Sequence, residues 1–377
     1  MSSYTSSSES HRRFVFWLLF SVAGLFALGV YLQPLNKYSG LTRIGSYSER
    51  EFGWNKPQLT FPRTKLEFPA SAEDSGQYGS YHDVVVLGDS FSRIWPELQW
   101  QNHLAATTGW SVATLNINKI RLGQVLASQE FHDHPPRVLI VESVERYLTG
   151  VLKRNTSGCG KPDFDTFKAQ SSLQINRGEA NTAFTMITQF GGHLPGTTQR
   201  VERERAWIEI KLGYVRGYIW NSLLRNLLGD AHTDAAKVAL AKDAPFSSVN
   251  KHAMLVYKED FRKVEWWREM GMPELGCRIE KMRKQVEANG QTRFVLMVAP
   301  DKLTAYADFL SDKGLRDISA LFELSVHLPE VMPRLDLALT SAINNGEQDV
   351  YLPDDTHWGS SGNQIAAETL LTFLRNP

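Results

Sequence analysis

The sequence predicts an α/β fold, in which a parallel β-sheet flanked by helices follows one N-terminal transmembrane helix. Three observations predict it. The N-terminal region contains one long apolar stretch without charges. Continuous apolar runs, typical of strands buried on both faces of a parallel sheet, recur along the rest of the chain. Helical segments separate these runs, as crossover helices do between parallel strands.

The apolar stretch extends from Phe14 to Leu32 and would measure about 28 Å as a helix, close to the thickness of a bilayer core. Arg12 and Arg13 precede it, and basic flanks stay in the cytoplasm. We therefore expect a single-pass protein of the bacterial inner membrane whose bulk lies in the periplasm. A cleaved signal peptide is the alternative, although its apolar region is normally shorter, about 7–15 residues.

The domain organisation follows from this stretch and from a change of pattern at Asp83. Residues 36–82 are rich in Ser, Gly, Pro and Tyr and show little periodicity. We expect a cytoplasmic tail (1–13), a transmembrane signal anchor (14–35), a stalk or linker (36–82) and an α/β domain (83–377) with an insertion at about 150–270.

Five apolar runs of the domain are predicted as strands. They are DVVVLG (83–88), WSVATLNI (110–117), RVLIVES (137–143), RFVLMVA (293–299) and the short DVYL (349–352). Helices are expected at about 96–108, 121–131, 274–289 and 362–374.

Two further features of the sequence leave alternatives open. A helical region near 201–228 carries Trp207, Tyr214, Tyr218 and Trp220, whose spacing favours a core face, with a sugar-binding platform as the alternative. In an exported domain Cys159 and Cys277 lie in an oxidising compartment, where they either pair or remain separate.

Composition excludes several classes of protein. The chain has 377 residues, of which 42% are hydrophobic and 22% charged, as in a folded protein. Its 41 basic residues balance 41 acidic ones, so no nucleic-acid partner is expected. Two cysteines exclude a disulfide-rich scaffold and a thiolate zinc cluster.

The first motif with chemical potential is Gly88-Asp89-Ser90-Phe91-Ser92, directly after the first predicted strand. Ligands of open α/β sheets bind outside the carboxyl ends of the strands. A serine on the turn that leaves such a strand presents its hydroxyl at that edge, where it can act as a nucleophile if a base takes its proton.

The second motif is Asp354-Asp355-Thr356-His357-Trp358, on a loop that enters the last predicted helix. A carboxylate two or three residues before a histidine can accept a hydrogen bond from the imidazole and hold its tautomer. The other ring nitrogen is then available to a serine. By itself each motif is typical of a turn, but together they favour a Ser-His-Asp triad.

Four segments together resemble the SGNH hydrolase-like domain of the alginate O-acetyltransferase family. Two are the motifs above. The third is a strand ending in Glu142 followed by Glu145 and Arg146, and the fourth is Ala299-Pro300-Asp301-Lys302 with Tyr306 one turn later. The resemblance spans residues 83–370 and implies an SGNH-hydrolase-like (flavodoxin-like) sheet.

The resemblance also implies acetyl transfer onto an exported polysaccharide. It maps the nucleophile to Ser90, the base to His357 and the orienting acid to Asp355, with Asp89 in the same motif as the nucleophile. In ordinary SGNH enzymes the acid stands three residues before the histidine, which would select Asp354.

The best-known alginate members carry the Asp-Thr-His-Trp segment before the Gly-Asp-Ser segment. Here the serine comes first, as in ordinary SGNH esterases, which weakens alginate as the specific substrate.

Candidate oxyanion donors are the amide of the nucleophile, Gly123, and Asn118 or Asn116. Glu142, Glu145 and Arg146 are expected as a structural or substrate-orienting cluster, with an internal salt bridge as the alternative. Lys302 and Tyr306 are expected to pack at a helix start.

The expected function is therefore a polysaccharide O-acetyltransferase with an acyl-serine intermediate. The alternatives are an acetyl esterase or deacetylase with the same residues, or a non-catalytic scaffold of an export complex. No metal or organic cofactor is expected. The expected partners are a polysaccharide acceptor and a membrane-bound acyltransferase that supplies acetyl.

Overall fold

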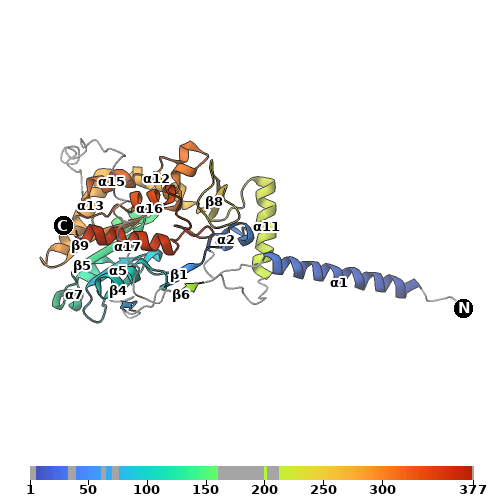
Figure 1. The fold of residues 1–377 in the computed structure, drawn as a ribbon, viewed down its shortest axis with the longest axis horizontal. Coiled ribbons are helices and arrows are strands. Elements are labelled where there is room, and N and C mark those ends of the chain that lie inside the picture. The colour runs from blue at the N-terminus through green and yellow to red at the C-terminus, as the bar shows by residue number, and fades with distance from the viewer. Residues whose placement is uncertain are drawn as a thin grey trace.

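Five parallel strands form the central sheet, in the order β2-β4-β3-β5-β9. In the computed structural model, which describes residues 6–32, 40–60, 65–69, 76–159, 199–201 and 212–375, the sheet lies at the centre of the domain (Figure 1). The strands are β2 (Leu66–Glu67), β3 (Val84–Gly88), β4 (Val112–Asn116), β5 (Val138–Val144) and β9 (Arg293–Ala299).

The sheet confirms the predicted α/β class and four of the five predicted strands. The run at 349–352 is not a strand of the sheet, because only Tyr351 pairs there, in an isolated bridge with Trp358. The fifth strand is instead the two-residue β2 at the edge of the sheet.

Alternate residues of each central strand point to opposite faces of the sheet, so each face supports its own apolar core. Val84 and Val86 face the first core, whereas Val85 and Leu87 face the second. The first core is covered by α5 (Trp100–Thr108), α16 (Leu335–Asn344) and α17 (Ser360–Arg375). The second is covered by α8 (Leu148–Asn155), α13 (Met272–Glu287) and α15 (Leu321–His327).

Further helices lie between these elements along the chain. They are η1 (Ser90–Ser92), α6 (Leu122–Leu126), α7 (Gln129–Asp133), η2 (Glu145–Tyr147), α12 (Glu259–Met270), α14 (Lys302–Ala305), η3 (Ala307–Phe309) and η4 (Lys313–Leu315).

Residues 40–60 belong to the folded domain, so the prediction of a stalk is wrong for this segment. It forms α2 (Gly40–Gly45), α3 (Glu49–Phe52) and β1 (Gln58–Thr60). Leu41 and Phe52 are buried against the antiparallel hairpin of β7 (Ala235–Ala239) and β8 (Ala253–Tyr257). Strand β1 pairs with β6 (Gln199–Val201). The composition is that of a linker, but the few apolar side chains find partners that are distant in sequence.

The predicted N-terminal helix is present as α1 (Ser6–Leu32). Within its segment Ser8–Tyr31, an 18-residue window has a mean hydropathy of 2.2 and is 6% buried, so the helix is long and apolar enough to cross a membrane. Figure 1 shows α1 leading away from the domain, with α11 (Leu212–Leu228) lying across its end.

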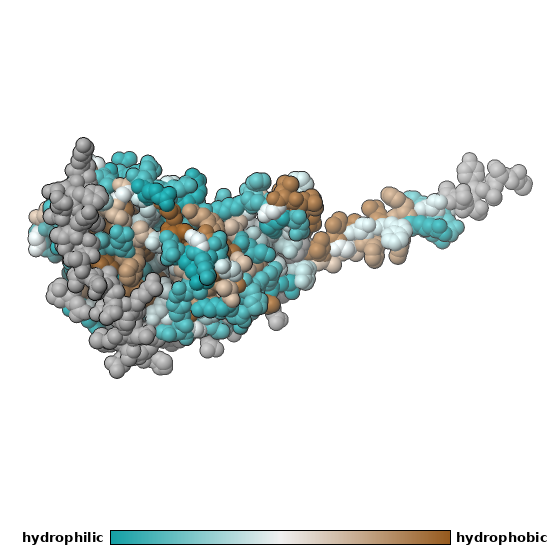
Figure 2. Space-filling model, turned by 90° about the horizontal axis from the view of Figure 1, so that it is seen from above, coloured by the Kyte–Doolittle hydropathy of each residue, from teal (hydrophilic) through white to brown (hydrophobic). Residues whose placement is uncertain are grey.

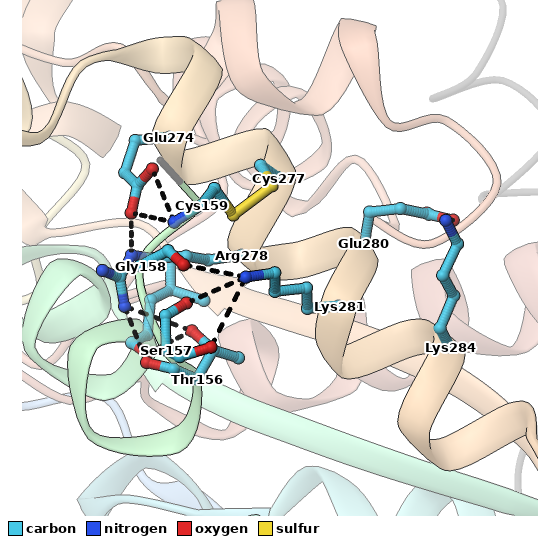
Figure 3. Close-up of a disulfide and its surroundings, with 11 residues drawn as sticks. Thr156, Ser157, Gly158, Cys159, Glu274, Cys277, Arg278, Glu280, Lys281 and Lys284 are labelled. Atoms are coloured by element: carbon cyan, nitrogen blue, oxygen red, sulfur yellow. Dashed lines mark hydrogen bonds and ion pairs between the residues drawn. A yellow bond between two sulfur atoms is a disulfide. The ribbon is translucent and has the colours of Figure 1, made fainter. Parts of the chain in front are cut away.

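Cys159 and Cys277 form a disulfide, which answers the question that the sequence left open. It joins the segment after α8 to α13 (Figure 3). Polar contacts surround it: Glu274 accepts from the Cys159 amide at 3.2 Å and from Arg278 Nε at 2.6 Å, and Arg278 donates to the Thr156 carbonyl at 2.8 Å. A cross-link over 118 residues is typical of proteins that fold in an oxidising compartment.

Candidate active site

Ser90 lies on a tight turn at the carboxyl end of β3, where the strand order of the sheet reverses. Gly88 allows the turn, because a Cβ there would lie 2.7 Å from Ser92 Cβ and 2.9 Å from Glu142 Oε2. Asp89 holds the turn from both sides: one carboxylate oxygen accepts from the Phe91 amide at 2.9 Å and the other from the Val144 amide at 2.7 Å.

His357 lies within hydrogen-bonding distance of Ser90. Its Nε2 is 2.8 Å from Ser90 Oγ, and its Nδ1 is 2.5 Å from Asp355 Oδ1. With the proton on Nδ1, the ring donates to the carboxylate and accepts from the hydroxyl. The rings of Phe91 and Trp95 flank the imidazole, with centroids at 4.8 and 5.2 Å. The structure therefore brings together a hydroxyl, an imidazole and a carboxylate in the order that nucleophilic catalysis requires.

Asp355, rather than its neighbour, is the acid in contact with the imidazole. Asp354 is fully buried, and its carbonyl accepts from the Leu41 amide at 2.9 Å. Of the two spacings considered, the shorter one matches the geometry.

Trp95 is a neighbour of the imidazole that the sequence did not single out. Its backbone has φ +54°, a left-handed conformation that is strained for a bulky residue. No sequence signal marks such a residue, because its conformation is imposed by its surroundings.

The second oxygen of the Asp355 carboxylate accepts a hydrogen bond from the Gly40 amide, at 2.6 Å. Gly40 is the first residue of α2, in the segment predicted as a stalk. A Cβ at Gly40 would lie 2.3 Å from Asp355 Oδ2, so only glycine allows this approach. The contact joins residues 315 positions apart, and no local pattern of the sequence announces it.

We predict that Gly40→Ala reduces kcat and leaves KM nearly unchanged, because the new methyl group displaces the carboxylate that orients His357. A hydrogen bond to a charged group contributes about 1.5–3 kcal/mol, so the loss should be roughly 10- to 100-fold. Gly150→Ala on α8 is the matched control, since a Cβ there meets nothing within 4 Å. Equal kcat values for the two variants would contradict the positioning role.

Lys302 organises the loop that carries Asp355. The side chain is fully buried, and its Nζ donates to the carbonyls of Leu352, Pro353 and Asp355 at 2.8, 2.9 and 3.1 Å. Burial lowers the pKa of Lys302 to about 8, although the charges of Asp354 and Asp355 oppose this effect. The role exceeds the expected packing at a helix start.

We predict that kcat falls as the pH rises through about 8. The neutral amine has two N–H groups for three carbonyls, so the loop loses a hydrogen bond.

The stability of the fold is expected to change with pH in the opposite direction to kcat. The folded pKa lies below the usual value near 10.4, so between these two pH values the unfolded state binds more protons and stability rises with pH. Profiles of kcat against pH test the first expectation, and denaturant unfolding at several pH values tests the second, each measured on the wild type and on Lys302→Met. An alkaline loss that persists in Lys302→Met would count against Lys302 as its cause.

Glu142, on β5, supports the Ser90 turn through hydrogen bonds. It is fully buried, and its Oε2 accepts from the Asp89 amide at 3.0 Å and from Ser92 Oγ at 2.8 Å. Burial, together with the negative charge of Asp89, raises the pKa of Glu142 well above its usual value. The hydrogen bonds of Glu142 shown here are with the Ser90 turn, as expected of a structural residue.

Arg146 and Glu145 belong to a buried ion cluster, so the internal salt bridge is the alternative that the structure supports. Arg146 lies 3.2 Å from Asp260 and 2.5 Å from Asp301, and Lys263 lies 3.0 Å from Glu145. The cluster ties η2 to α12 and to the segment before α14. Tyr306 is also internal, packed against the rings of Phe246 and Tyr351 at 4.8 and 6.0 Å.

Tyr257, at the end of β8, is a polar group near the site that the sequence analysis missed. Burial, together with the negative charge of Asp355, raises the pKa of Tyr257 to about 12. Its hydroxyl therefore stays protonated at neutral pH and can donate a hydrogen bond. In the β7–β8 hairpin Tyr257 lies opposite Ala235.

Gly123 and Asn118, expected as oxyanion donors, form no hydrogen bond with Ser90 or His357 within the described ranges. Gly123 lies in α6, where its carbonyl accepts from Ala127, and the Asn118 side chain accepts from Arg154 at 3.4 Å. The Asn116 side chain accepts from the Asn118 amide at 3.0 Å. The Ser90 amide, in contrast, donates to no acceptor among the residues described and lies at the start of η1.

Comparison with known families bears on the His357 half of this site. Residues 255–377 match the SGNH hydrolase-like domain of acetyltransferase AlgX. This match agrees with the family suspected from the sequence and supports the SGNH-like type for residues 255–377, which contain two of the four segments, those at 299–306 and 354–358. It covers about a third of the chain and includes Asp355 and His357, whereas Ser90 lies outside it. No curated protein and no solved structure matches the chain.

Proposed function

We propose that the protein is an O-acetyltransferase that moves an acetyl group through an acyl-serine onto hydroxyl groups of an exported polysaccharide. One observation carries the proposal: His357 Nε2 lies 2.8 Å from Ser90 Oγ while its Nδ1 lies 2.5 Å from Asp355. The family match at residues 255–377 supports acetyl as the transferred group.

In the first half-reaction His357 takes the proton of Ser90 as Oγ attacks the carbonyl carbon of an acetyl ester or thioester. The Ser90 amide is the proposed donor to the oxyanion, and one such donor contributes roughly 3–4 kcal/mol in other enzymes. The imidazolium then gives its proton to the leaving group, which departs and leaves acetyl-Ser90. Asp355 remains ionised and stabilises the imidazolium.

In the second half-reaction His357 takes the proton of a sugar hydroxyl, whose oxygen attacks the acetyl-serine. Collapse of the tetrahedral intermediate breaks the bond to Ser90 Oγ, which recovers a proton from the imidazolium. The three side chains supply the nucleophile, base and acid, so this scheme requires no metal or organic cofactor.

The proposed setting follows from α1. A helix of this length and hydropathy supports a single-pass anchor in the bacterial inner membrane, with the catalytic domain in the periplasm. The disulfide is consistent with that compartment. The proposed acetyl source is a membrane-bound acyltransferase partner.

An acetyl esterase or deacetylase is the second candidate, because the serine precedes the histidine in the chain as in ordinary SGNH esterases. In that case water replaces the sugar hydroxyl in the second half-reaction. A purely scaffolding role is less well supported, because it gives no reason for the contacts among Ser90, His357 and Asp355.

The test uses the full chain in lipid nanodiscs with a chromogenic acetyl ester, with and without an acidic or neutral oligosaccharide. Mass spectrometry of the peptide containing Ser90 should show an added acetyl group after brief exposure. Formation of acetylated oligosaccharide would support the transferase, and release of acetate alone would support the esterase. If neither an acetyl adduct nor turnover of the ester were detected, only the non-catalytic scaffold would remain.

A further inference from the structure

Helix α11 exposes a largely apolar face, on which Arg216 is the one charged residue. Its large exposed side chains recur at helical spacing, and their exposed fractions range from 46% for Ile219 to 75% for Leu212. These large hydrophobic residues are Leu212, Ile219, Trp220, Leu223, Leu227 and Leu228. Outside α1 and α11, large exposed hydrophobic residues are scattered along the described chain. A concentration of this kind on one helix marks an interaction surface.

The opposite face of α11 is polar and is fastened to α2 and the turn after it. Tyr214 Oη donates to the Tyr47 carbonyl at 2.7 Å, and Arg225 donates to the carbonyls of Gly45 and Ser46 at 2.6 and 2.9 Å. The Arg225 guanidinium also lies 4.2 Å from the centre of the Tyr47 ring. The orientation of α11 is therefore set by the domain, and its apolar face must point away from it.

The apolar face points toward the side from which α1 leaves the domain. Figure 1 shows α2 on the domain side of α11 and α1 on the other side, with the axes of α1 and α11 crossing steeply. Helix α1 contacts α11 directly, and Arg50 of α3 holds the end of α1 by donating to the Tyr31 carbonyl at 2.8 Å. Figure 2 shows hydrophobic surface at this junction.

We propose that α11 lies in the surface of the membrane that α1 crosses, with its apolar face inserted into the boundary between headgroups and acyl chains. A helix that runs across the end of a membrane-spanning helix lies along the plane of the bilayer surface. Trp220 is the type of residue that favours this depth. Arg216, the one charged residue on the exposed face of α11, can extend its guanidinium to lipid phosphates.

This placement brings the candidate active site close to the membrane through two consecutive contacts. Helix α11 is bonded to the end of α2, and the first residue of α2 is bonded to Asp355. The inference itself does not depend on acetyl-transfer chemistry. If that chemistry is correct, the position suits an acyl donor delivered at the bilayer.

The test places one fluorescent label at a time on the full chain in vesicles of phosphatidylcholine and phosphatidylglycerol. Both native cysteines are in the disulfide, so a new cysteine is the sole labelling site. Leu223→Cys reports on the apolar face of α11. Leu25→Cys in α1 is the reference for lipid contact, and His252→Cys, on an exposed loop of the domain, is the reference for water.

We expect the label at residue 223 to shift its emission to the blue, to be quenched by lipids that carry a nitroxide near the headgroup, and to resist aqueous iodide. The label at residue 252 should respond to iodide alone. Iodide quenching at residue 223 equal to that at residue 252 would overturn the proposal. Shielding from both quenchers would overturn it in favour of a protein partner or a second copy of the chain. Absence of quenching at residue 25 by lipids that carry a nitroxide along the acyl chain would also overturn it, because the proposal requires α1 to span the bilayer.

Discussion

Replacing Ser90 with alanine is expected to reduce acetyl transfer and ester hydrolysis by at least about a thousand-fold. The hydroxyl supplies the attacking oxygen, and no neighbouring group can substitute for it: the nearby Ser92 is fully buried and donates to Glu142. The acetyl adduct on the Ser90 peptide should also disappear. Single-turnover kinetics and mass spectrometry of the same samples measure both effects.

The fold should tolerate this change, because the partner of the Ser90 hydroxyl is the partly exposed His357. Ser361→Ala makes the same change of residue type and is the control, because the Ser361 hydroxyl donates to the Gln348 carbonyl and not to His357. If Ser90→Ala kept the acetylation level of Ser361→Ala, Ser90 would not be the nucleophile and the proposed mechanism would be wrong.

Replacing Asp355 with asparagine is expected to lower kcat by roughly 10³- to 10⁴-fold. The carboxylate accepts from three N–H groups: the His357 ring, the His357 amide and the Gly40 amide. An asparagine side chain has one oxygen, so in either orientation its NH₂ group opposes at least one of these donors. The imidazolium also loses its counter-charge. Rapid kinetics across the pH range would measure the loss.

Asp354→Asn is the matched comparison, because it makes the same chemical change at the adjacent position. Asp354 is buried and acts on α2 through its carbonyl, which the substitution retains. We expect a change in stability with a far smaller loss of kcat. A larger kcat loss in Asp354→Asn than in Asp355→Asn would make Asp354 the orienting acid and assign a different geometry to the site.

The strands of the sheet core were predictable because burial on both faces requires a continuous apolar run. Val84, Val85, Val86 and Leu87 are all fully buried, as the run suggested. The same signal misled at 349–352, where Val350, Tyr351 and Leu352 are equally buried but lie in a loop. Burial, not strand pairing, is what an apolar run reports. The two-residue β2 is too short to produce any pattern.

The supporting parts of the site were less predictable. Glu142 and Lys302 stood out within the segments that carry the family resemblance, yet their roles depend on what lies opposite them. Gly40 went unnoticed because residues near it have the composition of a linker, and Tyr257 because its strand lies in the insertion. The candidate oxyanion residues Gly123 and Asn118 were inferred from position along the chain, which does not fix their distance from Ser90.

By itself the sequence determined the α/β class, the apolar N-terminal helix, and a Ser90 turn and an Asp-x-His loop capable of acyl chemistry. These are local features, because strand, turn and loop residues lie close together along the chain. Only the tertiary structure decided that Ser90 meets His357 across 267 positions and that Gly40 holds Asp355 across 315. Such contacts arise from packing of the whole domain, since the free energy that brings distant segments together comes from the burial of many side chains rather than from the residues that finally touch.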